Sequence, residues 1–597
     1  MNRGGRAGTN RLMLVILDDS GRRVFSDPLA VIRADSAAEV PEALAALEAA
    51  LGQGRHVAGW LGYELGYALE PRLGGAAGPL LRLGVFAAPD GEAPPVTSRA
   101  YAGPLRAEWD MGAYAGRFAT VKDYIAAGDI YQANLSFRAR FAFAGEPRAL
   151  YEQLLAQSGA AHCAYIDYGP HILSLSPELF FDLSADGRIT VRPMKGTTPR
   201  SGRDDQAERA ALAASAKDRA ENLMIVDLLR NDLSRIAQMG SVEVSDLFRI
   251  ETYPTLHAMV STVTARKRAD AGAADILRAL FPCGSVTGAP KIRAMEILRQ
   301  LESSPRGAYC GAIGHFSPDG SARFNVAIRT LTLWGDQGEL GIGGGVVQDS
   351  RMESEYAECL LKARFFEAGR KPLDLIETLR WVGPEIAKGP VDLSPGPTPQ
   401  CRAAKRGMRP GDGFSRLDSH LARMNQSARV FGMPFDDALA RAVLENSVAG
   451  KTGQWRVRLT LNEDGVHNAT AHDLPYNPPH WTYAISPQRT DSRDMFLRHK
   501  TNWRELYESE VKRLGADEVI FLNERGELTE GARSNIFIVR DDVVLTPPLM
   551  SGLLDGRLRA ELIARGRAQE AVLTPDDLAG EVYFGNSLRG LIPAVRL

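Results

Sequence analysis

The alternation of hydrophobic and polar residues along the chain predicts both strands and helices. Short apolar runs at 12–17 and 57–61 predict buried strands, and residues 37–51 have the three-to-four-residue spacing of an amphipathic helix. Residues 205–238 predict one or two long helices that face a core, because large aliphatic residues recur there at the same spacing. Residues 88–104 are rich in proline and glycine and predict a connector.

Strands and helices continue in an irregular order up to residue 368. This irregular order favours a large layered α+β domain over a barrel of parallel βαβ units. The predicted strands are at 163–168, 172–175, 256–264, 309–316, 324–333 and 340–347, and the predicted helices are at 273–280, 289–301 and 353–367.

A change in composition near residues 369–372 (GRKP) predicts a domain boundary, because it follows a helix and precedes a new strand at 373–379. The sequence therefore predicts a first domain at 1–368, a linker at 369–372 and a second domain at 373–597. After a loop rich in glycine and proline at 383–413, the order helix, strand, strand, helix is predicted from residue 414. Within that part, Asn523-Glu-Arg-Gly526 is typical of a hairpin turn.

The charge and cysteine content exclude several classes of protein. The 597 residues contain 71 Lys and Arg against 73 Asp and Glu, so no general attraction to nucleic acid or to an anionic membrane is expected. Five widely spaced cysteines without a CxxC motif argue against a disulfide framework and a zinc ribbon and favour a reducing compartment. The apolar run at 12–17 is too short for a signal peptide or a membrane span, so we expect a cytoplasmic protein.

Two carboxylates and a lysine near the end of the first half have the spacing of one helical face. Glu355, Glu358 and Lys362 are separated by three and four residues, so they would lie together on a helix. Such a face suits Mg²⁺ together with an anionic substrate, because Mg²⁺ prefers oxygen ligands and often takes some from its substrate. From spacing alone, a solvated face with a Glu–Lys pair is the simpler interpretation, and Glu221 by itself is an ordinary surface charge.

Six separated motifs in the first half, in the same order and spacing, resemble those of the chorismate-utilising enzymes. The resemblance covers roughly residues 10–368 and implies a large domain of layered antiparallel sheets that binds chorismate. The motifs are Ser176-Pro-Glu178, Arg192-Pro-Met-Lys195-Gly-Thr197, the run from Ser215 to Asp232, Gly284-Ser-Val-Thr287-Gly-Ala-Pro-Lys291, Ala327-Ile-Arg329-Thr330 and Gly343-Gly-Gly345-Val-Val.

The resemblance also implies how the substrate is held. A dianionic substrate among carboxylates needs a bridging cation and compensating Arg or Lys donors, which agrees with the implied ligand set. The implied Mg²⁺ ligands are Glu221, Glu355 and Glu358, and the implied substrate anchors are Arg329, Tyr309, Lys362, Thr287 and the amides around Gly344 and Gly345.

Lys195 separates the groups within this family. The sequence Pro193-Met-Lys195-Gly-Thr197 resembles the aminodeoxychorismate synthases, whereas anthranilate synthases resemble Pro-Ile-Ala-Gly-Thr. The resemblance implies that the lysine amine attacks C2 of chorismate while the C4 hydroxyl leaves, after which ammonia attacks C4 and expels the lysine. We expect Glu178 to protonate the leaving hydroxyl and His257 to support the site through a hydrogen bond.

The sequence predicts that ammonia comes from another protein. The five cysteines lie in the contexts HCA, PCG, YCG, ECL and QCR, and none matches the Gly-x-Cys-x-Gly turn of a glutaminase nucleophile. The family resemblance implies a separate glutamine amidotransferase subunit as the partner.

The second half carries another ordered set of motifs, over about 373–597, that resembles the fold-type IV pyridoxal-phosphate enzymes. Within that family the closing motif is most like 4-amino-4-deoxychorismate lyase, and the implied fold is a two-subdomain α/β domain. The motifs are Leu375-Ile-Glu377-Thr-Leu, His420-Leu-Ala-Arg423-Met, His499-Lys500-Thr501, Leu528-Thr-Glu530-Gly-Ala-Arg533-Ser534-Asn535, Gly552-Leu-Leu-Asp-Gly556-Arg557-Leu558-Arg559 and Phe584-Gly-Asn586-Ser587-Leu-Arg589-Gly.

Each implied cofactor residue has a physical task. Lys500 would bind pyridoxal phosphate covalently and then act as the proton-transfer base, and Glu530 would pair with the pyridine nitrogen and keep it protonated. The phosphate would be bound by Arg423, by Ser534 or Asn535, and by the backbone amides near Arg557 and Leu558. The loop at 383–413 departs from the family pattern at the expected entrance of this site.

Together the two halves predict synthesis of 4-aminobenzoate, a folate precursor, from chorismate. One alternative makes the second half an aminotransferase of small amino acids, and another makes it a catalytically silent scaffold. Release of pyruvate without a keto acid would distinguish the first alternative, and a lysine-dependent cofactor absorbance would exclude the second. The sequence leaves self-association through the second half open.

Overall fold

The chain forms two compact units in the computed structural model, which describes residues 13–89, 91–200, 202, 204–253, 256–383, 413–475 and 477–597. Unit 1 comprises Met1–Pro95, Pro104–Phe141 and Leu150–Arg370. Unit 2 comprises Val96–Gly103, Ala142–Ala149 and Lys371–Leu597, so it contains two short segments from the first quarter of the sequence.

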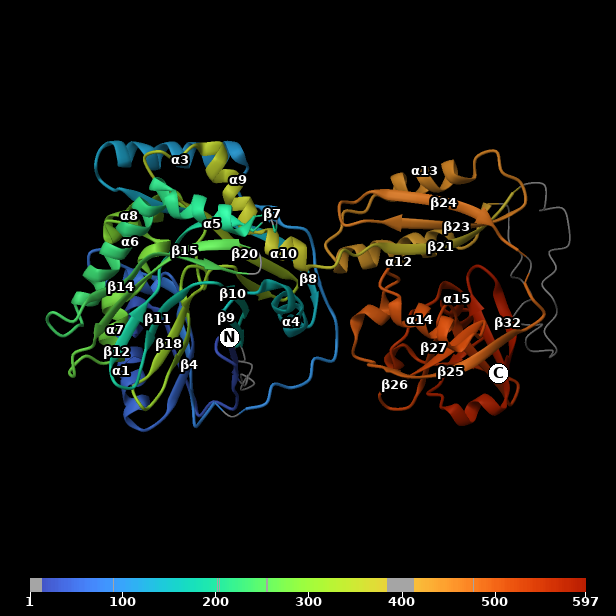
Figure 1. The fold of residues 1–597 in the computed structure, drawn as a ribbon. Coiled ribbons are helices and arrows are strands. Elements are labelled where there is room, and N and C mark those ends of the chain that lie inside the picture. Colours follow the sequence, from blue (N-terminus) through green and yellow to red (C-terminus); the bar gives the residue numbers. More distant parts are fainter. Residues whose placement is uncertain are drawn as a thin grey trace, which may run out of the picture. The chain divides into compact units, whose positions relative to one another are not determined.

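Unit 1 is built on two ten-stranded sheets (Figure 1), although residues 100–102 and 142–145 of the first sheet belong to unit 2. The first sheet has the order β16 (Gly288–Ala289), β8 (Gln132–Gly145), β20 (Gln337–Val346), β19 (Thr330–Trp334), β10 (His171–Ser176), β9 (His162–Asp167), β1 (Leu14–Asp18) and β2 (Arg22–Phe25), with β6 (Ala100–Ala102) and β7 (Arg106–Ala107) also paired to β8. The second sheet has the order β13 (Met194–Pro199), β15 (Leu256–Arg266), β12 (Arg188–Val191), β11 (Leu179–Leu183), β18 (Ala322–Val326), β17 (Ala312–Phe316), β4 (His56–Leu61), β5 (Ala77–Phe86) and β3 (Ala30–Ser36), with β14 (Glu243–Thr252) also paired to β15.

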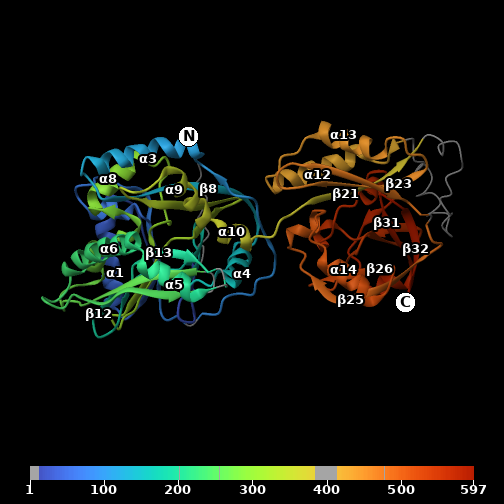
Figure 2. The same ribbon diagram turned by 45° about the horizontal axis from the view of Figure 1, so that its top comes forward.

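Helices cover the sheets of unit 1 and close its main core. Helix α1 (Val40–Gly52) turns Leu44 and Leu47 into a cluster that also contains Leu277 of α7 (Ala273–Leu280) and Leu229 of α6 (Ala216–Ser234). Figure 2 shows α5 beside β13, the strand that carries Lys195. The other helices are η1 (Ala37–Glu39), α2 (Leu65–Leu69), α3 (Met111–Ala126), α4 (Pro147–Ser158), α5 (Asp205–Ala214), η2 (Gly284–Val286), α8 (Lys291–Leu301), α9 (Met352–Lys362) and α10 (Arg364–Gly369).

Unit 2 has two sheets, each with its own helices. The four-stranded sheet has the order β22 (Gly413–Phe414), β21 (Leu375–Val382), β23 (Gln454–Leu461) and β24 (His467–Asp473) and packs against α12 (Leu417–Val430) and α13 (Asp437–Val448). The eight-stranded sheet has the order β27 (Leu528–Gly531), β26 (Glu518–Asn523), β25 (Trp481–Thr490), β32 (Gly590–Arg596), β31 (Glu581–Asn586), β28 (Asn535–Arg540), β29 (Val543–Thr546) and β30 (Gln569–Glu570). The remaining helices are η3 (Met495–Arg498), α14 (Glu505–Leu514), η4 (Leu549–Ser551), α15 (Arg557–Ala564) and η5 (Pro575–Ala579).

The four-stranded sheet has one apolar face and one polar face, because side chains alternate along a strand. On β21 and β23, Leu379 and Val457 pack into the cluster that contains the apolar side chains of α12 and α13. Thr378 and Arg458 are paired across the two strands on the opposite face. That polar face lines the cavity described below.

The α+β architecture with antiparallel sheets in unit 1 is confirmed, and the helix at 273–280 is found at its predicted residues. Two details of the prediction for unit 1 are wrong. The connector at 88–104 contains β6, which pairs with β8. The strand predicted at 324–333 is two strands, β18 and β19, because residues 327–329 leave one sheet and enter the other.

The predicted order after residue 414 is also wrong, since two helices, α12 and α13, precede the strands and more than two strands follow. The hairpin turn at Asn523–Gly526 is confirmed and joins β26 to β27, and Gly526 adopts a left-handed backbone conformation there. The loop predicted at 383–413 lies almost entirely outside the described residues. No helix in the described part of the chain is long and apolar enough to cross a membrane.

Candidate active sites

Lys195 lies at the centre of the candidate site in unit 1. It projects from β13 toward β20, so that a Cβ atom at Gly345 would be 3.2 Å from its Nζ. Burial and Lys362 lower the pKa of Lys195, while Glu221, Glu178 and Glu358 oppose that shift, and the net pKa is lowered. Because Gly345 has no side chain, there is room for the Lys195 amine beside it. With its lowered pKa, this amine is easier to deprotonate than that of an ordinary lysine.

Glu178 is the buried acid of this site. Only 5% of the residue is exposed, and its Oε1 has no hydrogen-bond partner among the described residues. Burial raises the pKa of Glu178 to about 7, against smaller opposing contributions from Ser285 and Lys195. A carboxyl group with this pKa is partly protonated near neutral pH, which a general acid requires.

The three predicted metal ligands share one environment. Glu355 is buried and accepts a hydrogen bond from Ser350 Oγ at 2.6 Å, and a Cβ atom at Gly344 would be 3.4 Å from its Oε2. Burial raises the pKa of Glu221, and Glu355 contributes to that rise. Burial also raises the pKa of Glu358, but Lys362 and Lys195 outweigh it and the net pKa is lowered. Carboxylate oxygens are the ligands that Mg²⁺ prefers, but among the described residues the oxygens of these three side chains do not all lie within 4.8 Å of one another, so the Mg²⁺ site stays a prediction.

Lys362 joins these carboxylates to the glycine strand. Its Nζ donates to the carbonyl oxygen of Gly343 at 2.9 Å and lies 3.0 Å from Glu358 Oε1. The predicted face of α9 is therefore formed, with one cation already present beside its acids.

The other predicted anchors lie in different surroundings. Arg329 has a positive φ of 51° and a pKa lowered by burial, and among the described residues it makes no ion pair, so it remains available to an anion. Thr287 is buried, and its hydroxyl donates to the carbonyl oxygens of Cys283 and Gly284. Tyr309 is buried, and burial raises its pKa well above its ordinary value. Substrate contacts for Thr287 and Tyr309 stay predictions.

Sequence reasoning missed Gln132 and the neighbours of His257. Gln132 is fully buried on β8, neither polar atom of its amide has a hydrogen-bond partner among the described residues, and a Cβ atom at Gly345 would be 2.6 Å from its Nε2. An unsatisfied amide beside Lys195 is a candidate substrate contact, and only the fold brings the two together. His257 lies on β15 and faces two carboxylates of α5, Asp205 and Glu208.

The candidate site in unit 2 is a cavity of about 690 Å³ between the two sheets. It collects most of the predicted cofactor residues: Lys500, Glu530, Arg423, Ser534, Asn535 and Arg557 all line it. Leu558 does not line the cavity, but it belongs to the first turn of α15, which begins at Arg557 beside it.

Lys500 and Glu530 have the properties expected for a cofactor lysine and its partner acid. Burial lowers the pKa of Lys500 to about 8, with Glu377 opposing the shift and Arg423 adding to it. Burial raises the pKa of Glu530 to about 7, although Tyr507 donates to its Oε1 at 2.9 Å and the amide of Leu554 to its Oε2 at 3.1 Å. These donors hold the Glu530 carboxylate in one orientation.

The residues fit pyridoxal phosphate, with one adjustment to the predicted phosphate site. The side chain of Asn535 donates to the carbonyl oxygen of Leu554 at 2.9 Å, and Ser534 donates to Glu518 at 2.5 Å. Arg423 lines the cavity, but Glu377 accepts two hydrogen bonds from it, at 2.8 and 2.6 Å. Arg557 likewise donates to the Asp555 carboxylate at 2.5 Å, so the backbone amides at the N-terminus of α15 remain as the anion donors, in keeping with the ordinary use of helix N-termini for phosphate.

Arginine dominates the cavity wall. Seven arginines and Lys500 face three carboxylates there, and Arg456 and Arg458 make no ion pair among the described residues. Both lie on the polar face of β23, where Arg458 is paired with Thr378, and Arg456 lies opposite His472 of β24. Sequence reasoning missed these two arginines, because alternating charges on a strand are equally typical of a solvated face.

Comparison with known proteins assigns both parts of the chain. Residues 86–368 match the chorismate binding enzymes and residues 407–597 match the amino-transferase class IV family. The aminodeoxychorismate synthase component 1 of Klebsiella aerogenes is 48% identical over 259 residues, which are 42% of this chain and 56% of that protein. The chain thus spans about half the length of this curated relative.

Two solved structures extend the comparison. Anthranilate synthase component I from Streptococcus pneumoniae covers 61% of this chain and 93% of that chain at 24% identity and a TM-score of 0.50, which supports the fold of unit 1. A Mesorhizobium loti protein named as an amino-acid aminotransferase is 37% identical and covers 38% of this chain and 100% of that chain, with a TM-score of 0.32. The family matches thus divide the chain into a region similar to the chorismate binding enzymes, at residues 86–368, and a region similar to the class IV amino-transferases, at residues 407–597.

Proposed function

We propose that the chain makes 4-aminobenzoate from chorismate in two steps. In the first step, ammonia replaces the C4 hydroxyl of chorismate to give 4-amino-4-deoxychorismate and water. In the second step, this product loses pyruvate and becomes aromatic, which needs no further reactant. The two steps match the two domains in order, and the sequence similarity of unit 1 to an aminodeoxychorismate synthase supports the first step.

The observation that carries the first step is the placement of Lys195 against Gly345, among carboxylates, with a lowered pKa. A neutral Lys195 amine would attack C2 of chorismate while the C4–O bond breaks. Glu178, with its pKa near 7, would donate a proton to the departing hydroxyl so that it leaves as water. Ammonia then attacks C4, and the bond between C2 and Lys195 breaks to restore the free amine.

Charge balance in this site requires cations, since the substrate is a dianion and the site already holds carboxylates. Arg329 and Lys362 would bind substrate carboxylates, and Glu221, Glu355 and Glu358 would hold Mg²⁺. Mg²⁺, when bound, neutralises the ring carboxylate beside these acids. A separate amidotransferase subunit would supply ammonia, as the name component 1 of the Klebsiella relative suggests.

In the second step, the residues of unit 2 would bind, orient and deprotonate the intermediate. Pyridoxal phosphate, when bound, supplies the sink for the electrons of the broken C4–H bond. Lys500 would accept the C4 proton, because a pKa of about 8 leaves part of the amine neutral near pH 7. Electrons then move into the ring as the C3–O bond breaks, and the enolpyruvate that leaves becomes pyruvate.

The arginine wall favours this substrate over a small amino acid. 4-Amino-4-deoxychorismate carries two carboxylates, whereas a small aliphatic amino acid carries one. The phosphate of the cofactor needs one group of anion donors. Arg456 and Arg458, which make no ion pair among the described residues, are then left for the substrate carboxylates. They lie on the same face of β23, about 7 Å apart along the strand. The 37% identity to the Mesorhizobium protein keeps an amino-acid aminotransferase as the second candidate function.

Product analysis of the full chain with chorismate, Mg²⁺, an ammonium salt and pyridoxal phosphate tests the proposal. We expect 4-aminobenzoate and pyruvate in equal amounts without any keto acid. Lys195→Ala should abolish both products, Lys500→Ala should accumulate 4-amino-4-deoxychorismate, and Lys512→Ala, on the exposed side of α14, should behave as wild type. Full synthase turnover by Lys195→Ala would contradict the covalent step, and a requirement for a keto acid would favour the aminotransferase.

A catalytically silent second unit makes a different prediction. A silent unit would show no cofactor absorbance in the visible range. We expect a visible band that both borohydride and Lys500→Ala remove, because the band requires a bond between the lysine amine and the cofactor. Absence of the band in the cofactor-saturated wild type would support the scaffold interpretation.

A further inference from the structure

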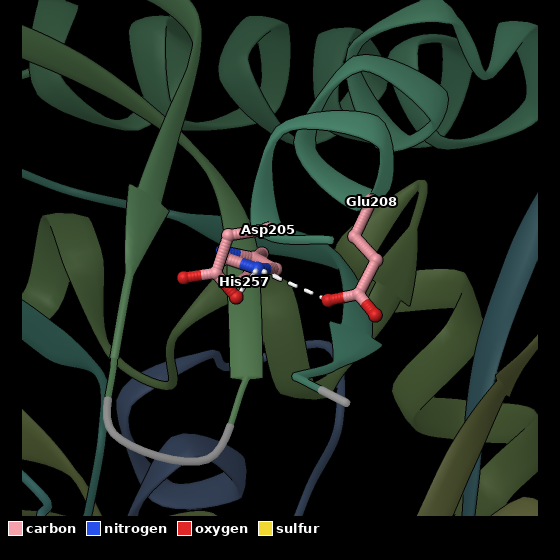
Figure 3. A group of neighbouring side chains, drawn as sticks. All are labelled: Asp205, Glu208 and His257. Carbon is pink, nitrogen blue, oxygen red and sulfur yellow. Dashed lines mark ion pairs between the residues drawn. The ribbon is translucent and has the colours of Figure 1, made fainter. Parts of the chain in front are cut away.

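His257 and two carboxylates of α5 form a cluster that the proposed reaction does not use as a unit (Figure 3). Asp205 and Glu208 lie one turn apart at the start of α5 and point toward the imidazole of His257 on β15. His257 is 0% exposed, and its Nδ1 is 3.0 Å from Thr252 Oγ1. Its Nε2 has no hydrogen-bond partner among the described residues and faces the two acids.

The distances in this cluster agree with those between ligands of one metal ion and are longer than those of ordinary hydrogen bonds. His257 Nε2 is 3.4 Å from a carboxylate oxygen of Glu208 and 3.6 Å from one of Asp205, and all three ligand atoms lie within 4.8 Å of one another. Hydrogen bonds from nitrogen to oxygen are about 2.9 Å long. Two ligands of a tetrahedral ion with bonds of about 2.1 Å are roughly 3.4 Å apart, which agrees with the observed separations.

We propose that His257 Nε2, Glu208 and Asp205 bind one divalent transition-metal ion of the Zn²⁺ class, with water in the remaining position. Imidazole nitrogen suits such ions better than Mg²⁺, which distinguishes this site from the carboxylate cluster around Glu355. Binding would also satisfy a fully buried nitrogen that otherwise lacks a partner. Arg200 donates to both oxygens of Asp205, at 3.0 and 2.9 Å, and thereby neutralises part of the charge of that ligand.

The metal would act on the segment that carries the reactive lysine. β15 pairs with β13 so that His257 lies opposite Thr198, three residues after Lys195. A metal ion between α5 and β15 would fix this segment and occupy the His257 nitrogen. We therefore expect Zn²⁺ to inhibit amination of chorismate, a consequence that rests on the proposed function, whereas metal binding itself does not depend on it.

Titration of the full chain with Co²⁺ in excess Mg²⁺ tests the site. Mg²⁺ occupies the sites formed by oxygen ligands alone. Co²⁺ absorbs visible light when it is bound by few nitrogen and oxygen ligands, so its binding can be followed directly. We expect one Co²⁺ per chain with this absorbance, displaced by Zn²⁺. Glu208→Gln and His257→Gln should each weaken binding at least tenfold. Glu243→Gln, an exposed acid on β14, should leave the titration unchanged.

Circular dichroism of each variant separates loss of a ligand from loss of folding. Glu208 is more informative than His257, because its side chain is 21% exposed whereas that of His257 is fully buried. Equal Co²⁺ affinity in wild type and Glu208→Gln, with both folded, would overturn the proposal. Failure of wild type to bind Co²⁺ in competition with Mg²⁺ would overturn it as well. If Co²⁺ binds as described but chorismate is not aminated, the metal site stands and the proposed function fails.

Discussion

Replacement of Glu178 by glutamine should stabilise unit 1 while it abolishes amination of chorismate. Burial raises the pKa of this carboxyl group from 4.5 to about 7. The native state therefore binds the Glu178 proton more tightly than the unfolded state does. Stability from this group is fully present below pH 4.5 and is lost as the pH rises to about 7, where native Glu178 ionises. Glutamine stays neutral at every pH and avoids that loss.

The magnitude follows from the size of the shift. A difference of about 2.5 pH units at about 1.4 kcal/mol each gives a cost of about 3 kcal/mol for ionised Glu178 at pH 8. At pH 5 the same linkage leaves a cost of about 1 kcal/mol. The stability advantage of Glu178→Gln should thus grow by about 2 to 3 kcal/mol between pH 5 and pH 8. Any pH-independent effect of the amide cancels in this comparison.

Urea unfolding of the full chain, with a pulse of protease and detection of peptides from unit 1, measures this advantage without interference from unit 2. Glu243→Gln is the matched control, since this exposed acid should give the same small difference at both pH values. A stability difference for Glu178→Gln that is equal at pH 5 and pH 8 would show that the carboxyl group is already ionised in the native state. The same result would remove Glu178 as the proposed acid.

Three further changes test the remaining assignments. Glu358→Gln should raise the Mg²⁺ concentration required for amination at least tenfold, while Glu353→Gln on the exposed side of α9 should not; equal Mg²⁺ titrations would exclude Glu358 as a ligand. Arg458→Met should raise the KM for 4-amino-4-deoxychorismate about tenfold, or about 1.4 kcal/mol, and should weaken binding of an aromatic dicarboxylate more than that of benzoate; equal losses would place this arginine outside the substrate contact. Tyr101→Ala, at a residue only 1% exposed in the core of unit 2, should destabilise unit 2 by about 3 kcal/mol or more, whereas Tyr131→Ala, at a residue 68% exposed, should change stability by less than about 0.5 kcal/mol in urea unfolding.

Local patterns predicted those elements whose burial follows a regular spacing. The helix at 273–280 could be predicted because six of its eight residues are buried and the polar ones share a face. Strand β8 could not be predicted in this way, because its buried positions include the polar residues Gln132, Asn134 and Arg138. These side chains are buried only by the packing of the folded unit. Such polar residues hide the apolar alternation that indicates a strand.

The candidate sites could be predicted only where motifs carried them. Lys195 and Lys500 could be named from their neighbours in sequence, and the structure places each at the centre of its group. The contact of Glu208 with His257 could not be predicted, since 49 positions separate them and only the pairing of β13 with β15 brings α5 to that histidine. Arg458 was missed for the same reason: a second sheet must close over its strand before its charge faces a cavity.

The residues that line the cavity of unit 2 and the residues that form its core come from partly different parts of the chain. Every residue that lines the cavity lies between Ile376 and Arg589, so the linker predicted at 369–372 separates the two sets of reacting groups. Unit 2 nevertheless includes 96–103 and 142–149, and Tyr101 from the first of these packs against Phe431 with ring centroids 5.2 Å apart. A fragment that begins after the linker would keep all residues of the cavity and lose part of its core. Weak lyase activity in such a fragment would therefore be explained by the lost packing, and it would not by itself contradict the proposed elimination of pyruvate.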